Sequence, residues 1–205
     1  TVRGVEGLVV TNNLIDGTGA PSVNGYTQPD PSKFYGWRKA VELGCVYPYA
    51  GDTSVGRSIF AHNKVGRCLD ASYQTNYSGA SYVSFTDNVF DHSYNPHDCP
   101  EVSGRYFPIV GGVSASHFTF ARNEYRLGAP HSSIYVAGYS GTTNSYSGDR
   151  WYSSRASIDA NLDVITNSTY ADCDFWLPST VKLGSGCTYD SACYFHSGRS
   201  GGTPA

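Results

Sequence analysis

The chain lacks methionine altogether and carries little charge, since Asp, Glu, Lys and Arg make up 15% of its 205 residues. Hydrophobic residues reach 40%, which excludes an intrinsically disordered chain. No stretch approaches the roughly 20 apolar residues that span a bilayer as a helix, so we expect no membrane insertion. Thr1 begins neither a signal peptide nor a transit peptide, and we expect an excised domain or a mature fragment.

Basic residues are also scarce. Lys and Arg number 14 against 17 Asp and Glu, which gives a net charge of −3 at pH 7. Nucleic-acid affinity comes mainly from clustered basic side chains that neutralise phosphates. We therefore expect no nucleic-acid partner.

Motifs of nucleotide and zinc chemistry are missing as well. The chain has no Gly-x-x-x-x-Gly-Lys and no His-Glu-x-x-His. Glycoside hydrolysis needs two placed carboxylates, and Asp and Glu residues are available, but nothing singles out a pair. We expect no enzyme and no cofactor. A secreted carbohydrate-active enzyme, a glycosidase or lyase that uses an Asp/Glu pair, stays open as an alternative.

Tyrosine, glycine, serine and threonine dominate what is present, with 17 Tyr and 23 Gly. Scarce Glu and Lys disfavour helices, and short apolar runs bounded by turn residues favour strands. The alternation at His117–Arg122 places Phe118 and Phe120 in the core and Thr119 outside. Lys33–Leu43 fits a helix or a strand. Other expected strands are Val5–Val10, Arg57–His62, Ser81–Thr86, Arg105–Val110, Ile134–Tyr139, Arg150–Ser154, Leu162–Thr166, Phe175–Leu183 and Cys193–Phe195.

These segments predict an all-β fold without a repeat period. We expect one compact β-barrel or β-sandwich domain over residues 1–197, built from about ten short antiparallel strands with long Tyr/Ser/Gly-rich loops. Asp16-Gly17 and Asn24-Gly25 are typical hairpin turns. Residues 198–205 are expected to form a flexible C-terminal tail.

The cysteines form an even set with 15 possible pairings, and they are Cys45, Cys68, Cys99, Cys173, Cys187 and Cys193. Cys187 and Cys193 are the most plausible local disulfide. Two sequons begin at Asn76 and Asn167 and would be glycosylated only in a secretory pathway. The polar cluster Asp91–Cys99 matches no zinc spacing, so we expect no metal site.

The clearest candidate for binding is the polar, tyrosine-rich stretch Tyr139–Trp151. Its rings and short hydrogen-bonding side chains suit sugars, whose apolar faces stack on aromatic rings. Trp151 begins an expected strand and fits the core better than a ligand platform. The candidate ligand-binding residues are Tyr139, Ser140, Thr142, Asn144, Tyr146, Asp149, Arg150 and Trp151.

With its length, its short strands and loops such as Tyr139–Asp149, the chain resembles the capsid spike domains of avian astroviruses. The resemblance implies a β-barrel-like spike that forms a homodimer on the virion surface and binds a host-cell receptor or glycan. We therefore expect a receptor-binding domain, virion-borne or extracellular, that mediates host-cell attachment. A structural self-association module stays open beside the enzyme alternative.

Overall fold

The computed structural model describes part of the chain. This part comprises residues 2–3, 7–16, 22–23, 26–27, 39–44, 58–66, 71–75, 82–92, 107–112, 115–127, 141–153, 161–163 and 165–205. All regular secondary structure in these residues is β-strand, so the predicted all-β class is confirmed.

The largest sheet, sheet B, has eight strands in the order β2-β7-β10-β14-β17-β21-β24-β27, and every neighbouring pair is parallel. Its strands are β2 (Val9–Thr11), β7 (Ser58–Ala61), β10 (Val83–Thr86), β14 (Thr119–Ala121), β17 (Ser145–Ser147), β21 (Thr169–Ala171), β24 (Thr188–Tyr189) and β27 (Thr203–Pro204).

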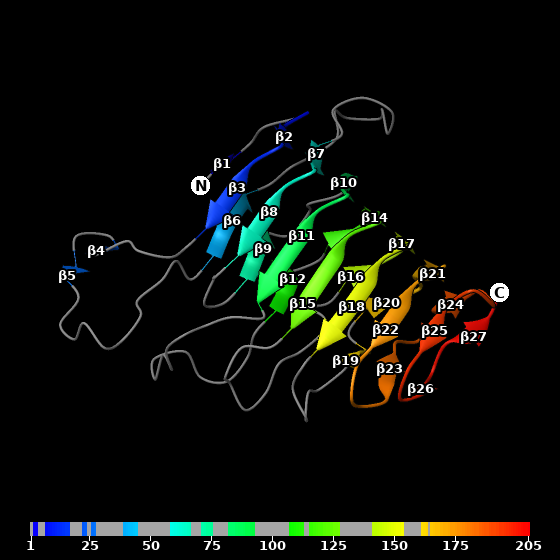
Figure 1. Ribbon diagram of the computed structural model, residues 1–205. Helices are drawn as coiled ribbons and strands as arrows, with labels where there is room; N and C mark the ends of the chain where they lie inside the picture. The colour runs from blue at the N-terminus through cyan, green and yellow to red at the C-terminus, as the bar shows by residue number, and fades with distance from the viewer. Residues whose placement is uncertain are drawn as a thin grey trace.

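The second large sheet, sheet C, has seven strands that are also parallel throughout. In spatial order from the N-terminal end they are β3 (Leu14–Asp16), β8 (Lys64–Gly66), β11 (Val89–His92), β15 (Glu124–Leu127), β18 (Arg150–Ser153), β22 (Asp174–Trp176) and β25 (Tyr194–Phe195). Figure 1 shows this row running from the blue end of the chain to the red end.

Three smaller parallel sheets supply the remaining sides. The first contains β1 (Val2–Arg3), β6 (Lys39–Gly44), β9 (Ala71–Thr75) and β12 (Phe107–Gly112); the second contains β13 (Ala115–Ser116), β16 (Gly141–Thr142) and β20 (Ile165–Thr166); the third contains β19 (Asn161–Leu162), β23 (Val181–Leu183) and β26 (Arg199–Ser200).

The chain visits these sheets in rotation. After β7 in sheet B it enters β8 in sheet C, then β9 in the first small sheet, and it returns to sheet B at β10. Each circuit therefore stacks one coil on the previous one, with strands about 4.8 Å apart. The architecture is a parallel β-helix, a solenoid in which each coil contacts mainly its neighbours (Figure 1).

The prediction of an antiparallel barrel or sandwich is therefore wrong, and so is the prediction that the chain has no structural repeat. Short strands bounded by turn residues are typical of hairpins, but they are equally typical of coils whose corners lie at positions such as Asp87-Asn88 and Arg122-Asn123. One hairpin does occur, because β4 (Ser22–Val23) and β5 (Tyr26–Thr27) pair antiparallel on either side of Asn24-Gly25. Of the segment Lys33–Leu43, residues 39–43 belong to β6.

Two central coils show how the corner between sheets B and C is built. Its first residue has a positive φ, as in Asp87 at 54° and Arg122 at 55°. Its second residue, Asn88 or Asn123, is buried and bonds to the coils on both sides. At these two corners the left-handed residue turns the chain without a glycine, whereas Gly148 takes the same place before Asp149. Asparagine and aspartate tolerate that conformation better than most residues.

The second residues of successive corners form a ladder of side-chain hydrogen bonds along the solenoid. The Asn63 Nδ2 donates to Asn88 Oδ1 at 3.1 Å, and Asn88 Nδ2 donates to Asn123 Oδ1 at 2.9 Å. Asn123 Nδ2 donates in turn to Asp149 Oδ1 at 2.9 Å. Because buried amides need partners, this ladder fixes the register between coils.

Aromatic side chains fill the interior in two columns, one behind each large sheet. Behind sheet C the column passes from Tyr125 to Trp151 with ring centroids 4.7 Å apart, and from Trp151 to Phe175 at 4.4 Å. Behind sheet B, Phe120 stacks on Tyr146 at 4.6 Å. Among the described residues, Tyr125, Tyr146, Tyr170 and Tyr189 therefore lie in the core.

Two predictions about the core are confirmed. Phe118 and Phe120 are buried while Thr119 is exposed, and Trp151 is fully buried. Residues 199–204, expected in a tail, include β26 and β27, which pair with the preceding coils.

Candidate functional site

The strongest candidate for a binding surface is the outer face of sheet C near its C-terminal end. In a strand, alternate residues point to opposite faces, so the residues beside the buried column point outward. Trp176 follows buried Phe175, and Tyr152 follows buried Trp151. The coil stacking brings these outward side chains from separate parts of the sequence to one place.

Four exposed rings gather there, and we call them the aromatic platform: Tyr152, Trp176, Tyr194 and His196. Trp176 is 45% exposed, Tyr194 43% and Tyr152 39%, and His196 is exposed. Trp176 is the centre, with its ring 4.9 Å from that of Tyr194 and 5.4 Å from that of His196. Tyr152 and Trp176 are paired residues on adjacent strands.

Charged side chains continue both rows of the platform toward the N-terminal end. Arg126 pairs in register with Tyr152, and Arg150 stands in the neighbouring row next to Asp174. Arg150 Nε lies 3.0 Å from Asp174 Oδ2, and Arg126 Nη1 lies 3.2 Å from Asp91 Oδ2.

These pairs hold both guanidinium groups in place at the surface. The pKa of Arg126 is raised, first by its side-chain hydrogen bond to Glu124, so its charge is constant. A row from Asp91 through Arg126, Tyr152 and Trp176 to His196 covers four strand spacings, a span of about 19 Å. The platform thus combines flat apolar rings with fixed hydrogen-bonding groups along one line.

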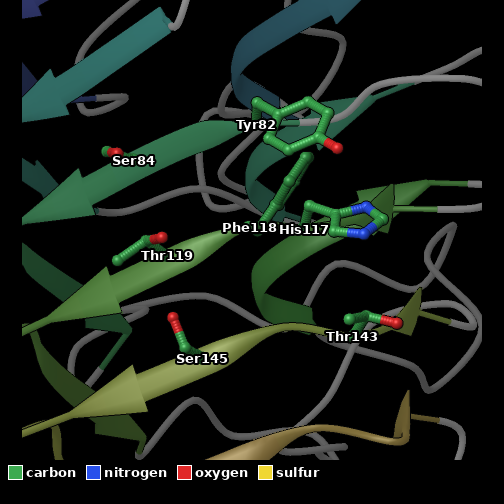
Figure 2. Close-up of a pocket in the computed structure, with 7 residues that line it drawn as sticks. All are labelled: Tyr82, Ser84, His117, Phe118, Thr119, Thr143 and Ser145. Carbon is green, nitrogen blue, oxygen red and sulfur yellow. The ribbon is translucent and has the colours of Figure 1, made fainter. Parts of the chain in front are cut away.

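A second surface feature is a shallow pocket on sheet B (Figure 2). Tyr82 and His117 stack with ring centroids 4.9 Å apart, and both have a positive φ at the corner that enters sheet B. The pocket has a volume of about 230 Å³. The full lining is Tyr82, Ser84, His117, Phe118, Thr119, Thr143 and Ser145.

The register explains the hydroxyl groups of this pocket. Ser84, Thr119 and Ser145 are paired residues on β10, β14 and β17, so their side chains form one outward row (Figure 2). A volume of about 230 Å³ falls below the 300 to 1,000 Å³ of ordinary ligand pockets. The pocket suits a single small polar ring, whereas the platform suits a longer ligand.

The residues predicted to bind ligand in Tyr139–Trp151 do not gather on an exposed loop. Asn144, Tyr146, Asp149 and Trp151 are buried. Thr142 and Arg150 are half-buried, and Tyr139 and Ser140 lie outside the described residues. Of this set, Arg150 lies next to the platform, because it pairs with Asp174, the neighbour of Tyr194 on the adjacent strand. From residue 141 on, the stretch forms strands β16, β17 and the start of β18 with two coil corners between them.

The three described cysteines carry free thiols, so the local disulfide predicted between Cys187 and Cys193 is not formed. Cys187 donates to the Ile165 carbonyl at 3.3 Å, away from that partner. Cys45, Cys68 and Cys99 lie outside the described residues, as does the sequon at Asn76. Asn167 is exposed at a coil corner, and its Nδ2 donates to Thr142 Oγ1 at 3.4 Å.

Features of catalysis are weak in the described part of the chain. Asp149 has a pKa raised to about 7, mainly by burial, but it is fully enclosed in the ladder and has no access to a substrate. Gly198–Gly202 has the Gly-x-Ser-x-Gly spacing of serine hydrolases, which sequence reasoning missed. Ser200 lies in the short strand β26 rather than at a strand-to-helix turn, so the spacing has no catalytic setting.

The described residues contain no group of three or more His, Cys, Asp or Glu side chains arranged to hold a metal ion. They also contain no helix long and apolar enough to cross a bilayer. Of the cluster Asp91–Cys99, residues 93–99 lie outside the described residues.

Sequence reasoning missed the platform because its members come from three coils. Trp176 and Tyr194 lie in segments that were predicted as strands, and the in-out alternation Phe175-Trp176 was available as a signal. Their proximity depends on the register Phe175 to Phe195, which the sequence alone does not reveal. Comparison of the chain with protein-family models, with curated proteins and with solved structures finds no match.

Proposed function

We propose that this chain is a carbohydrate-binding domain that holds a glycan chain on the aromatic platform. The observation that carries the proposal is the exposure of Trp176, Tyr194 and Tyr152 beside one another on an ordered sheet. A soluble protein exposes such neighbouring rings at a cost, and patches of this kind usually mark binding sites. Sugars present apolar C–H faces that stack on rings and hydroxyls that bond to charged side chains.

The charged rows support a sugar over a purely apolar partner. Arg150 pairs with the Asp174 carboxylate at 3.0 Å and donates to the Asp172 backbone carbonyl at 2.6 Å, which leaves donors on the guanidinium and acceptors on the carboxylates for hydroxyls. The solenoid form also suits a linear polymer, because successive coils present equivalent positions at a regular spacing. Attachment to a host-cell glycan, by a spike or another extracellular domain, is the use that agrees with the expectation from the sequence.

Single-stranded nucleic acid is the competing ligand, because bases also stack on rings beside arginine. The net charge of −3 works against it, since such binding depends on phosphate neutralisation. Oligonucleotides therefore belong in the same experiment as a comparison.

The test is a glycan array followed by titration of the best oligosaccharide with the wild-type chain and three variants. Trp176→Ala should weaken binding about tenfold or more, which corresponds to about 1.4 kcal/mol, and Trp176→Phe should recover part of the loss. Ile59→Ala is the matched control, because Ile59 is also an exposed apolar residue, at 40%, but lies on sheet B, whereas the platform lies on sheet C. The proposal fails if the array is blank, if Trp176→Ala binds as tightly as Ile59→Ala, or if oligonucleotides bind more tightly than any glycan.

A further inference from the structure

The ladder of corner residues changes chemistry at its C-terminal end. After Asn63, Asn88, Asn123 and Asp149, the next corner carries Cys173, which directly precedes β22 as those residues precede their own strands. Cys193 directly precedes β25 and holds the same position one coil later. Asp174 and Tyr194, the next residues along, are paired on adjacent parallel strands.

The backbone brings the two cysteines within the range of a disulfide. The Tyr194 N–H donates to the Cys173 carbonyl at 2.8 Å, so the corners are stacked in register. Adjacent parallel strands lie about 4.8 Å apart, and disulfides join Cα atoms about 4.4 to 6.8 Å apart. No shift of the main chain is needed to bring these Cα atoms into that range.

The thiols themselves converge. Cys173 Sγ donates to the Ala171 carbonyl at 3.3 Å, and Cys193 Sγ donates to the Tyr170 carbonyl at 3.4 Å. These acceptors are consecutive carbonyls of β21, and the two thiols are also hydrogen-bonded to each other. Cys187 lies apart, since its thiol donates to Ile165.

The two thiols differ in reactivity. Cys193 is half-buried, and its hydrogen bond with Cys173 lowers its pKa, so its thiolate is available to an oxidant from solvent. Cys173 is fully buried, and the same hydrogen bond, followed by burial, raises its pKa. This asymmetry suits an attacking thiol at the surface and a resolving thiol beneath it.

We propose that Cys173 and Cys193 are an oxidation site at which a disulfide forms across the last two coil corners. The Cys193 thiolate attacks one sulfur of a low-molecular-weight disulfide such as oxidised glutathione, forms a mixed disulfide and expels one thiolate. The Cys173 thiol, on losing its proton, then attacks Cys193 Sγ and expels the second thiolate. Two protein thiols are oxidised to one disulfide, and one glutathione disulfide is reduced to two glutathione molecules.

The consequence is a clamp across two successive coils, each of which contacts mainly its neighbours. A bridge between successive corners closes a loop around one coil, and loops of similar size raise the melting temperature of a chain this long by roughly 6 to 12 °C. The site is independent of the aromatic platform and does not rest on the proposed function.

The test treats the full folded chain with oxidised glutathione, blocks remaining thiols and maps the peptides by mass. Trypsin separates residues 156–182 from 183–199, and chymotrypsin cleaves after Tyr189 between Cys187 and Cys193. The expected product is a cross-link between the peptides that carry Cys173 and Cys193, two hydrogen masses lighter than their sum. Oxidised wild type should melt several degrees above the reduced chain.

Variants make the result specific. Cys187→Ser should form the cross-link as the wild type does, whereas Cys193→Ser should form none. Cys173→Ala should stop at a mixed disulfide of Cys193 with glutathione, with circular dichroism as the check that it folds. A cross-link from Cys187, a wild-type chain that stops at the mixed disulfide, or thiols that react only after denaturation would overturn the proposal.

Discussion

Replacing Asp149 by asparagine should stabilise the protein at neutral and alkaline pH. Asp149 occupies a ladder position that asparagine holds in four earlier coils, at Asn13, Asn63, Asn88 and Asn123. Its Oδ1 accepts from the Asn123 N–H at 2.7 Å and from Asn123 Nδ2 at 2.9 Å. Its Oδ2 is buried without a hydrogen-bond partner. In the earlier coils the equivalent atom is an amide nitrogen, and in Asn123 it donates to the Phe85 carbonyl.

The same pattern would direct a proton on Asp149 Oδ2 to the Phe120 carbonyl, so the ladder favours the neutral acid. Burial raises the pKa of Asp149 to about 7, while hydrogen bonds from Asn123 and the charge of Arg150 oppose that rise. The buried hydroxyls of Tyr125 and Tyr146 also face the group.

The direction of the pH effect follows from these values. Below pH 3.8 the carboxyl is neutral in both the folded and the unfolded chain. Between pH 3.8 and about 7 the unfolded chain loses this proton and the folded chain keeps it, so stability falls as pH rises and levels off above about 7. A shift of about three pKa units corresponds to at most about 4 kcal/mol.

The assay is urea unfolding of wild type and Asp149→Asn at pH 5 and pH 8. The amide cannot ionise and can donate where Oδ2 cannot, so the variant should gain roughly 1 to 4 kcal/mol over the wild type at pH 8 and much less at pH 5. Other titrating groups contribute equally to the free energy of unfolding of both proteins, so the difference between wild type and variant at each pH isolates Asp149. A gain that is equal at both pH values, or a variant less stable at pH 8, would refute the reasoning.

Three further changes test the fold. Gly184→Ala should destabilise by about 3 kcal/mol or more, because its Cβ would lie 1.9 Å from the Ile165 carbonyl oxygen. Gly198→Ala meets no atom within 4 Å but has a φ of +85°, so it should cost only the strain of that conformation, about 1 to 2 kcal/mol, and equal thermal shifts would contradict the packing. Asn123→Ala should cost about 2 to 4 kcal/mol in urea unfolding, since it leaves buried partners in both adjacent coils unsatisfied, and a loss below 1 kcal/mol would argue against the ladder. Tyr170→Phe removes a buried hydroxyl without a partner, so its melting temperature should equal or exceed that of the wild type.

The sequence predicted local structure better than architecture. The alternation of Phe118, Thr119 and Phe120 identified a strand and its buried face, because that pattern depends on neighbours in the chain. The direction of strand pairing depends on residues far away, and Asn88 contacts ladder partners 25 and 35 residues distant. Insertions of unequal length between coils conceal the repeat.

The corners explain why a hairpin fold was predicted. Asp87-Asn88 and Arg122-Asn123 have the composition and length of reverse turns. In reverse turns and in coil corners alike, asparagine often takes a positive φ or follows a residue that does. What distinguishes the corner is that the second side chain is buried and bonded between coils. The composition of Tyr139–Trp151 was misleading in the same way, since its tyrosine at 146 and tryptophan at 151 fill the core.

The aromatic column behind sheet C also has an optical consequence. Tyr125, Trp151 and Phe175 stack in sequence with centroids 4.7 and 4.4 Å apart and small angles between their planes, and Phe195 extends the series at 4.9 Å from Phe175. Rings held this closely exchange excitation energy, so Tyr125 can transfer energy to Trp151, and the coupled transitions contribute to the near-ultraviolet circular dichroism signal. That contribution depends on the stacking of successive coils, so its loss accompanies their separation.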